Sequence, residues 1–207
     1  EPAPQPSLSS SVNRVLHLAS QSPRCREFHE RLGVRFDVVD VDVPEVRTPG
    51  EPHADYVGRV AREKAGAGLL KLSGVPGAVV LGADTEVVLD GELFGKPRDE
   101  AHAADMLRRL SGRGYEVITA VSLVSAGREA QAVSHSQVRV AAMSDADIAR
   151  YLASGEWEGK AGAYAIQGRY EAHIEHLSGS YSGVMGLPLH DTAKLLREFG
   201  IVAGTSA

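Results

Sequence analysis

Strand-like and helix-like hydrophobic patterns alternate along this chain, and no repeat or low-complexity linker separates them. Short apolar runs at residues 15–19 and 78–83 are typical of buried strands, whereas the three- and four-residue spacing of apolar positions after Asp55 is typical of a helix. The alternation predicts an α/β fold in which a mixed, twisted sheet is flanked by helices around a central cleft. We expect residues 14–203 to form a single domain with two lobes around that cleft. Residues 1–13, rich in Pro and Ser, are expected to be a disordered extension.

Local signals predict where individual elements begin and end. Ser22 followed by Pro23 is typical of a helix start, and Asp90-Gly91 is the pair expected in a two-residue hairpin turn. Ser144, with Asp147 three residues later, predicts a capping box. Further strands are expected at 35–41, 86–89, 115–124, 130–142 and 171–177, and further helices after Asp99 and from His190 to Phe199.

The charge balance and the cysteine content exclude several classes of protein. The 207 residues include 22 Lys+Arg and 27 Asp+Glu, a formal charge of −5, which argues against a broad binder of nucleic-acid polymers. The single cysteine, Cys25, excludes an intramolecular disulfide and a cysteine-based zinc cage. No apolar run approaches the ~18 residues of a membrane helix, and the first residues lack a signal-peptide pattern. We therefore expect a cytoplasmic protein that binds no membrane.

Several basic residues are candidates for binding phosphate. Arg24 lies at the predicted strand-to-helix turn, where free backbone N–H groups attract anions. Lys64 lies on an apolar helix stripe, so its side chain either reaches the surface or enters a cleft. Lys96 is a loop lysine next to Pro97. Arg24 alone is as consistent with a solvated helix face as with a site, and each lysine alone is more often a surface residue than a site residue. Together with an acidic centre, the three would suit a polyphosphate.

A carboxylate and a hydroxyl follow the apolar run at residues 78–83. Asp84 and Thr85 are unexpected beside such a strand unless its end opens into a cleft, which is where α/β sheets bind ligands. Asp84 is then a candidate metal ligand or a general base for an attacking water. The alternative is an aspartate that begins a turn.

Cys25 and Arg31 have the Cys-x5-Arg spacing of cysteine-dependent phosphatases. That chemistry needs a tight loop whose backbone amides surround the phosphate. The five residues between them contain no glycine, include two carboxylates and are predicted to be helical. An incidental cysteine is therefore the better interpretation.

The segment at residues 159–168 is rich in glycine and alanine. Small residues at this density leave room for a ligand or for a close backbone approach. Within it, Gln167 offers both a donor and an acceptor, which can match the edge of a base. The alternative is a tightly packed structural crossing.

Taken together, these motifs resemble the Maf family of nucleoside triphosphate pyrophosphatases, and the resemblance extends from Leu16 to Phe199. An ordered series of this length is specific to the family. The segments that carry it are Leu18-Ala19-Ser20-Gln21-Ser22-Pro23-Arg24, Ala61-Arg62-Glu63-Lys64-Ala65, Gly82-Ala83-Asp84-Thr85, Gly95-Lys96-Pro97, Leu110-Ser111-Gly112, Lys160-Ala161-Gly162-Ala163-Tyr164-Ala165-Ile166-Gln167-Gly168, Gly179-Ser180-Tyr181 and Val184-Met185-Gly186-Leu187-Pro188.

The resemblance implies a Maf or inosine triphosphatase-like fold and hydrolysis of a nucleoside triphosphate between its α and β phosphates. A divalent cation, Mg²⁺ or Mn²⁺, is the implied cofactor, and a homodimer is the assembly expected of the family. Asp84 would accept a proton from water, and Glu45 would share the metal with Asp84. The residues implied to bind substrate are Ser22, Arg24, Lys64, Thr85, Lys96 and Gln167.

Thr85 and Gln167 match the branch of the family that acts on dTTP and UTP. A glutamine amide pairs well with the carbonyl and N–H edge of a pyrimidine, and a wrong base would leave those groups unpaired. Cys25 departs from the family, which usually has a second arginine there. The resemblance thus implies a dTTP/UTP pyrophosphatase, which also has modified pyrimidine nucleotides as candidate substrates. The alternative is a nucleotide-binding regulator of cell division or septum formation that needs no catalysis.

Overall fold

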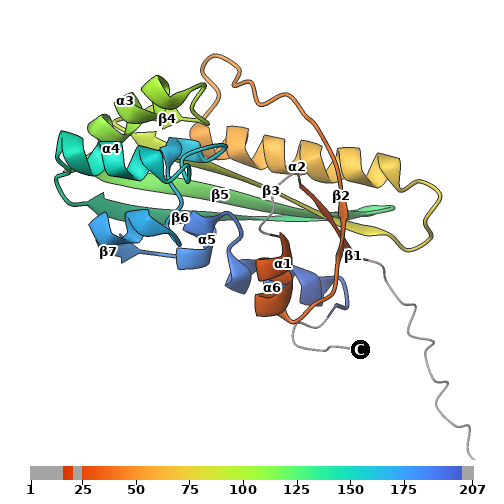
Figure 1. The fold of residues 1–207 in the computed structure, drawn as a ribbon. Helices are drawn as coiled ribbons and strands as arrows, with labels where there is room; N and C mark the ends of the chain where they lie inside the picture. The colour runs from red at the N-terminus through yellow and green to blue at the C-terminus, as the bar shows by residue number, and fades with distance from the viewer. Residues whose placement is uncertain (1–15, 21–24, 202–207) are drawn as a thin grey trace, which may run out of the picture.

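A computed structural model describes residues 16–20 and 25–201 of the chain (Figure 1). In chain order its elements are β1 (Leu16–Ala19), α1 (Cys25–Leu32), β2 (Asp37–Val39), α2 (His53–Lys71), β3 (Val79–Leu89), β4 (Glu92–Phe94), α3 (Glu100–Leu110), β5 (Gly114–Ser125), β6 (Arg128–Val140), α4 (Asp145–Ala153), the 3₁₀ helices η1 (Ala161–Ala163) and η2 (Arg169–His173), β7 (Ile174–Ser178), α5 (Tyr181–Met185) and α6 (Leu189–Glu198).

The strands form one mixed seven-stranded sheet, which confirms the predicted fold class. Its order is β2-β1-β3-β5-β6-β7, with β4 paired to β3. The β1 strand is parallel to β2 and β3, whereas β3, β5, β6 and β7 are antiparallel to one another. No helix in the described part of the chain is long and apolar enough to cross a membrane.

Helix α2 covers one face of the sheet, while α1, α5 and α6 lie on the opposite side (Figure 1). The larger apolar core joins the second face to the surrounding helices, with Leu81 and Leu123 from the sheet and Leu107 and Phe199 from α3 and the end of α6. Two smaller clusters lie beneath α2. Alternate residues of the central strands β3 and β5 therefore enter different cores, as a pleated strand requires.

Residues 79–89 form one continuous strand, so the prediction of two separate strands was wrong. Antiparallel pairing with β5 extends from Val80 opposite Val124 to Val88 opposite Glu116. This ladder keeps the backbone extended through Asp84, which the sequence had suggested was at the end of a strand. Asp84 instead lies in the middle of a central strand, because pairing along the whole strand outweighs a local polar interruption.

The other side of β3 is only partly paired. Strand β1 pairs with residues 79–82 and β4 with residues 87–89, and no described strand pairs there with residues 83–86. The sheet therefore has an internal gap beside Asp84. This gap, rather than a strand end, is what opens the interior of the sheet to a ligand.

Most predicted boundaries agree with the structure. Asp90 (φ 49°) and Gly91 (φ 77°) form the β3–β4 turn, and the capping box of Ser144 and Asp147 is present in both directions. Strand β2 is shorter than predicted. The strand predicted from residue 171 begins only at Ile174.

The late start of β7 has a packing cause. The segment before it, η2, is a 3₁₀ helix that carries Tyr170 into the core, where its ring stacks on Tyr164 with centroids 4.4 Å apart. The carboxylate of Glu156 accepts the backbone N–H of Arg169 at the start of this helix. Neither interaction has a signal within η2 itself, because the partners, Tyr164 and Glu156, precede the helix in the chain.

Candidate active site

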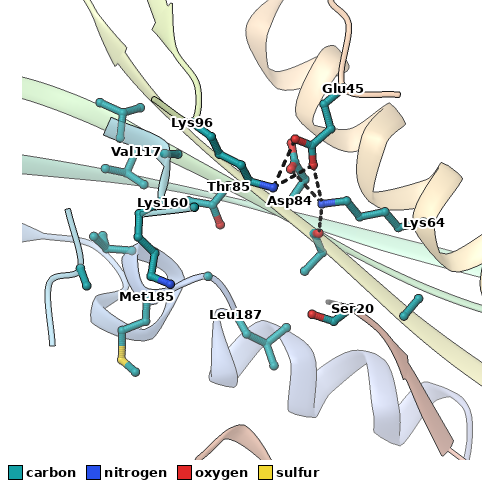
Figure 2. Close-up of a pocket in the computed structure, with 18 of the residues that line it drawn as sticks. Ser20, Glu45, Lys64, Asp84, Thr85, Lys96, Val117, Lys160, Met185 and Leu187 are labelled. Atoms are coloured by element: carbon teal, nitrogen blue, oxygen red, sulfur yellow. Dashed lines mark hydrogen bonds and ion pairs between the residues drawn. The ribbon is translucent and has the colours of Figure 1, made fainter. Parts of the chain in front are cut away.

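A cavity of about 630 Å³ lies beside the unpaired stretch of β3. Its walls come from segments that are far apart in the sequence, including β1, the loop before α2, α2 itself, β3, the loop after β4, the segment before η1 and the α5–α6 connection (Figure 2). Asp84 and Thr85 both line it, one from each face of β3, because the gap in the sheet exposes both sides of the strand.

Two carboxylates and two lysines form one connected cluster in this cavity (Figure 2). The Nζ atom of Lys64 lies 2.9 Å from Oε1 of Glu45 and 3.3 Å from Oδ1 of Asp84. The Nζ atom of Lys96 lies 3.3 Å from Oε2 of Glu45. The structure thus brings together four of the predicted site residues from four separate segments.

A glycine in β3 sets the position of Lys64. A Cβ atom at Gly82 would lie 2.5 Å from the carbonyl oxygen of Ala61 and 2.6 Å from the amide nitrogen of Ala65. Only glycine therefore allows α2 to approach the strand this closely. Because Lys64 precedes Ala65, the close approach also allows its Nζ to reach Asp84 and the Ala83 carbonyl oxygen, 3.4 Å away.

The cluster has shifted ionisation equilibria. Burial raises the pKa of Asp84 to about 6, although Lys64 opposes the shift. Burial would also raise the pKa of Glu45, but Lys64 and Lys96 outweigh it and the net shift is downward. Burial disfavours the charged form of Lys64, yet Asp84 and Glu45 outweigh it and raise its pKa. At neutral pH the lysine is charged, Glu45 is ionised and Asp84 is mostly ionised.

The donors in this cavity fit a divalent cation. The Oδ2 atom of Asp84 is buried and has no hydrogen-bond partner, and carboxylate oxygens are the ligands that Mg²⁺ and Mn²⁺ prefer. The described charged residues that line the cavity are four acidic and three basic, so they offer no excess positive charge to a triphosphate. They are Asp42, Glu45, Asp84, Glu158, Lys64, Lys96 and Lys160.

The described residues contain no group of three or more His, Cys, Asp or Glu side chains arranged to hold a metal by themselves. This agrees with the usual binding of Mg²⁺ through one or two carboxylates together with substrate phosphates. Glu45 and Asp84 are the residues that would hold such an ion.

Thr85 is held by a chain of hydroxyl groups. Its Oγ1 lies 3.0 Å from Oγ1 of Thr119, which donates to the carbonyl oxygen of Gly183 at 2.6 Å. Since a hydroxyl carries one proton, Thr85 must be the donor to Thr119. The lone pairs of Thr85 are then available to accept a hydrogen bond from a ligand in the cavity.

Comparison with known proteins identifies the family. The family model described as Maf-like protein matches residues 15–199. The chain belongs to the Maf family. A protein of Xylella fastidiosa (strain M23) named nucleoside triphosphate pyrophosphatase is 56% identical over 186 residues, which cover 89% of this chain and 98% of that protein. A protein of Xanthomonas euvesicatoria pv. vesicatoria named dTTP/UTP pyrophosphatase is 56% identical over 188 residues, 90% of this chain and 99% of that protein.

Two solved structures resemble part of this Maf-family chain. A nucleoside-triphosphatase / dITP/XTP pyrophosphatase from Mycobacterium abscessus has a TM-score of 0.37 at 20% identity and covers 60% of this chain and 72% of its own. The Ham1 protein of Staphylococcus aureus has a TM-score of 0.40 at 13% identity and covers 61% of this chain and 72% of its own.

Three predicted substrate contacts are not placed in the cavity by the structure. Ser22 and Arg24 lie outside the described residues. Gln167 is half-buried, and its Oε1 has no partner, but it is not among the residues that line the cavity. The roles of all three in this Maf-family chain stay predictions.

The Cys25–Arg31 segment is helical, as predicted, because it lies within α1. Arg31 has its Nη1 atom 3.2 Å from Sδ of Met185 and 3.9 Å from a carboxylate oxygen of Glu27. A helix cannot wrap its amides around a phosphate in the way that a cysteine phosphatase loop does. The thiol-phosphatase interpretation is therefore wrong.

Sequence reasoning missed one residue of the cavity wall and one buried carboxyl group in the strand beside it. Lys160 lines the cavity from a wall formed by the segment before η1, and its side chain points inward (Figure 2). Its signal was present, since it begins a motif in which only Gln167 was considered. Glu86 lies two residues after Asp84 and is 4% exposed; burial and the nearby Asp84 raise its pKa to about 9. A glutamate within an apolar strand was itself a signal that a polar environment lay nearby.

Proposed function

We propose that this Maf-family chain hydrolyses dTTP and UTP, and modified pyrimidine nucleotides related to them, to the nucleoside monophosphate and pyrophosphate. The names of the two relatives support this activity. The observation that carries the proposal is the position of Asp84, which is 6% exposed, lines the cavity and forms an ion pair with Lys64. Such a carboxylate is suited to act as a general base.

In the proposed reaction, Asp84 accepts a proton from a water molecule as the water oxygen bonds to the α-phosphorus. The bond from that phosphorus to the bridging oxygen breaks, and pyrophosphate leaves with the electron pair. Burial and a pKa of about 6 favour this role, because a base works best when its pKa lies near the working pH.

The lysines would exchange one set of anionic partners for another. In the free protein Lys64 and Lys96 are both paired with Glu45, so they are already positioned before substrate arrives. Phosphate oxygens would compete with Glu45 for them, and Lys160 would face the triphosphate from a separate wall. A divalent cation, when bound by Glu45 and Asp84, would neutralise phosphate charge and favour the leaving of pyrophosphate.

The pyrimidine preference is supported by the orientation of Thr85. With its own proton donated to Thr119, its oxygen can accept the ring N–H of thymine or uracil, a group that cytosine lacks. Gln167 would have to turn its amide toward the cavity to contribute. Thr85 therefore has the clearer structural support of the two.

One experiment tests the function directly. The purified chain is incubated with a panel of nucleoside triphosphates in Mg²⁺, Mn²⁺ or EDTA, and both phosphate products are identified. We expect pyrophosphate and monophosphate from dTTP and UTP, with little turnover in EDTA. A preference for purines such as 7-methyl-GTP would contradict the pyrimidine assignment. Tight binding of triphosphate without pyrophosphate release would instead support the regulatory alternative.

The proposed substrates also bear on where the protein works and in what form. Nucleoside triphosphates are intracellular metabolites, which agrees with the expectation of a cytoplasmic protein. The homodimer stays a prediction of the family resemblance and is tested by the solution mass of the purified chain.

A further inference from the structure

Residues 179–183 form a segment rich in glycine and serine to which the proposed reaction gives no role. The segment leads into α5, and hydrogen bonds hold it against β6. The backbone N–H of Ser180 donates to Oγ of Ser136 at 3.0 Å, and the backbone N–H of Gly183 donates to Oγ of Ser180 at 2.9 Å. Ser136 is 2% exposed and Gly183 is buried. The carbonyl oxygen of Gly183 therefore has a fixed position inside the protein.

That carbonyl oxygen is the end of the hydrogen-bond chain that reaches Thr85. Thr119 donates to it at 2.6 Å, and Oγ1 of Thr85 lies 3.0 Å from Oγ1 of Thr119. Thr85 and Thr119 are directly opposite each other in the β3–β5 ladder, so their side chains leave the same face of the sheet. Thr119 is 1% exposed and does not line the cavity. It can therefore influence a ligand in the cavity only through Thr85.

The position of each proton in this chain follows from the groups present. A carbonyl oxygen carries no proton, so Thr119 must donate to Gly183. A threonine hydroxyl has a single proton, so Thr119 has none left for Thr85 and must accept the proton of Thr85. Thr85 then offers only lone pairs to a ligand. Without the hydroxyl of Thr119, the hydroxyl of Thr85 could rotate and either donate or accept.

The oxygen of Thr85 has open space on its cavity side. Thr85 lines the cavity, and so does Gly186 at the end of α5. A Cβ atom at Gly186 would lie 3.8 Å from Oγ1 of Thr85, which is ordinary contact distance. The φ angle of Gly186 is 124°, a conformation that favours glycine. The absence of a side chain at Gly186 thus leaves room for a ligand atom next to an oxygen that can only accept.

We propose that Thr119 is a positioning residue for base selection, which makes Thr85 an obligatory acceptor and so disfavours cytosine nucleotides. The inference deepens the proposed function and rests on it for the contact between Thr85 and the base. Uracil and thymine have an N–H group at ring position 3, to which an acceptor-only hydroxyl can bind. Cytosine has an unprotonated nitrogen there, so two acceptors would face each other and both would lack a hydrogen bond.

The test compares kcat/KM for UTP and CTP, whose bases differ only at ring positions 3 and 4. The variants are Thr119→Val, which keeps the shape of the side chain but removes the hydroxyl, and Thr119→Ser, which keeps the hydroxyl. Thr192→Val is the matched control, because Thr192 is a threonine of α6 that is 0% exposed and whose hydroxyl has no partner among the described residues. Urea unfolding confirms that each variant is folded.

We expect the wild type to prefer UTP, and we expect Thr119→Val to lower the UTP-to-CTP ratio of kcat/KM by about tenfold or more, the scale of one buried hydrogen bond. Thr119→Ser and Thr192→Val should keep the wild-type ratio. A purely structural role of Thr119 would lower both rates in Thr119→Val and leave their ratio unchanged. That result would overturn the inference.

A second measurement needs no variant. In 3-methyl-UTP a methyl group replaces the hydrogen at ring position 3, so the wild type should use this nucleotide at least about tenfold less well than UTP. Equal use of 3-methyl-UTP and UTP would overturn the inference. Equal release of pyrophosphate from UTP and CTP would also overturn it but would leave the hydrolase in place. Failure to release pyrophosphate from either UTP or dTTP would refute the proposed function, and the inference with it.

Discussion

The ammonium group of Lys64 lies 3.3 Å from a carboxylate oxygen of Asp84, although the two residues are 20 positions apart in the sequence and belong to different elements, α2 and β3. The contact depends on Gly82, which lets α2 lie directly on β3. It limits the rise in the pKa of Asp84 that burial would otherwise cause. A structural feature of helix packing thus determines the ionisation of the proposed base.

Replacing Asp84 with Asn should remove turnover and leave nucleotide binding in place. Asn has nearly the same shape but cannot accept the proton of the attacking water, so the rate should fall about 10²- to 10⁴-fold, the range for loss of a general base. The measurement compares pyrophosphate release with equilibrium binding of dTTP. Full activity in Asp84→Asn would remove Asp84 from the mechanism.

Replacing Lys64 with Met should move the acidic limb of the pH–rate profile. Burial and the charge of Glu45 raise the pKa of Asp84, and Lys64 is the largest of the effects that lower it. Without the lysine, the pKa of Asp84 should therefore rise further. Activity then needs a higher pH, because the base must be ionised. The profile of kcat/KM is measured for the variant and for Lys71→Met, an exposed lysine in the last turn of the same helix. An unshifted limb in Lys64→Met would contradict the electrostatic role.

Lys160 should contribute to triphosphate affinity. Its side chain enters the cavity from a wall that carries neither Lys64 nor Lys96 (Figure 2), and a hydrogen bond to a charged group is worth about 1.5–3 kcal/mol. Lys160→Met should therefore raise KM for dTTP by roughly tenfold or more, with the same products. An unchanged KM and kcat would place Lys160 outside the substrate site.

Sequence reasoning predicted which residues lie together in the site better than it predicted how the strand opens to them. Asp84, Glu45, Lys64 and Lys96 come together as the family resemblance implied. The reason given from the pattern, that Asp84 ends a strand, was wrong, because the opening is a gap between β1 and β4 on one side of a continuous strand. Such a gap is a property of strand pairing, and no local pattern records it.

The missed residues have a related explanation. Glu86 was assigned only to a short strand over residues 86–89, and its burial at 4% exposed depends on packing between distant segments. The predicted base contact of Gln167 rests on its chemical type alone, and the residue is not at the cavity wall. Composition and spacing give the kind of group present, whereas its direction depends on packing between distant segments.

The buried Glu86 should make the metal-free protein less stable as the pH rises. Its pKa is about 9 in the folded protein against an ordinary value of 4.5 for a solvated glutamate, so the folded state holds the proton more tightly. The resulting stability is fully present below pH 4.5 and is lost as pH rises toward 9. Asp84 has the same sign but titrates between 3.8 and about 6. A comparison at pH 6.5 and 8.5 therefore isolates Glu86.

The measurement is the free energy of unfolding in urea, with EDTA present, for the wild type and Glu86→Gln. The amide does not titrate, so the wild type should lose about 2 kcal/mol more than the variant between these two pH values. Parallel pH dependences of the two proteins would show that Glu86 is not held protonated.

Alanine substitutions at Gly82 in β3 and at Gly66 in α2 distinguish the effect of close packing between these two elements from the effect of helix propensity. In Gly82→Ala the new Cβ would meet backbone atoms of Ala61 and Ala65 within 2.6 Å, so α2 must move away from β3. We expect a loss of about 1–3 kcal/mol in the free energy of unfolding, the usual cost of overpacking.

Because Lys64 moves with α2, Gly82→Ala should also lower kcat and shift the acidic limb upward, as Lys64→Met does. Gly66 lies in α2 itself, and a Cβ atom at this position would have no neighbour within 4 Å among the described residues outside its own helix turn. Gly66→Ala should therefore raise stability by up to about 1 kcal/mol, since alanine favours the helix, and leave the pH profile unchanged. If Gly82→Ala destabilises the protein but retains the wild-type profile, the close approach of α2 serves stability alone, and the reach of Lys64 to Asp84 does not depend on it.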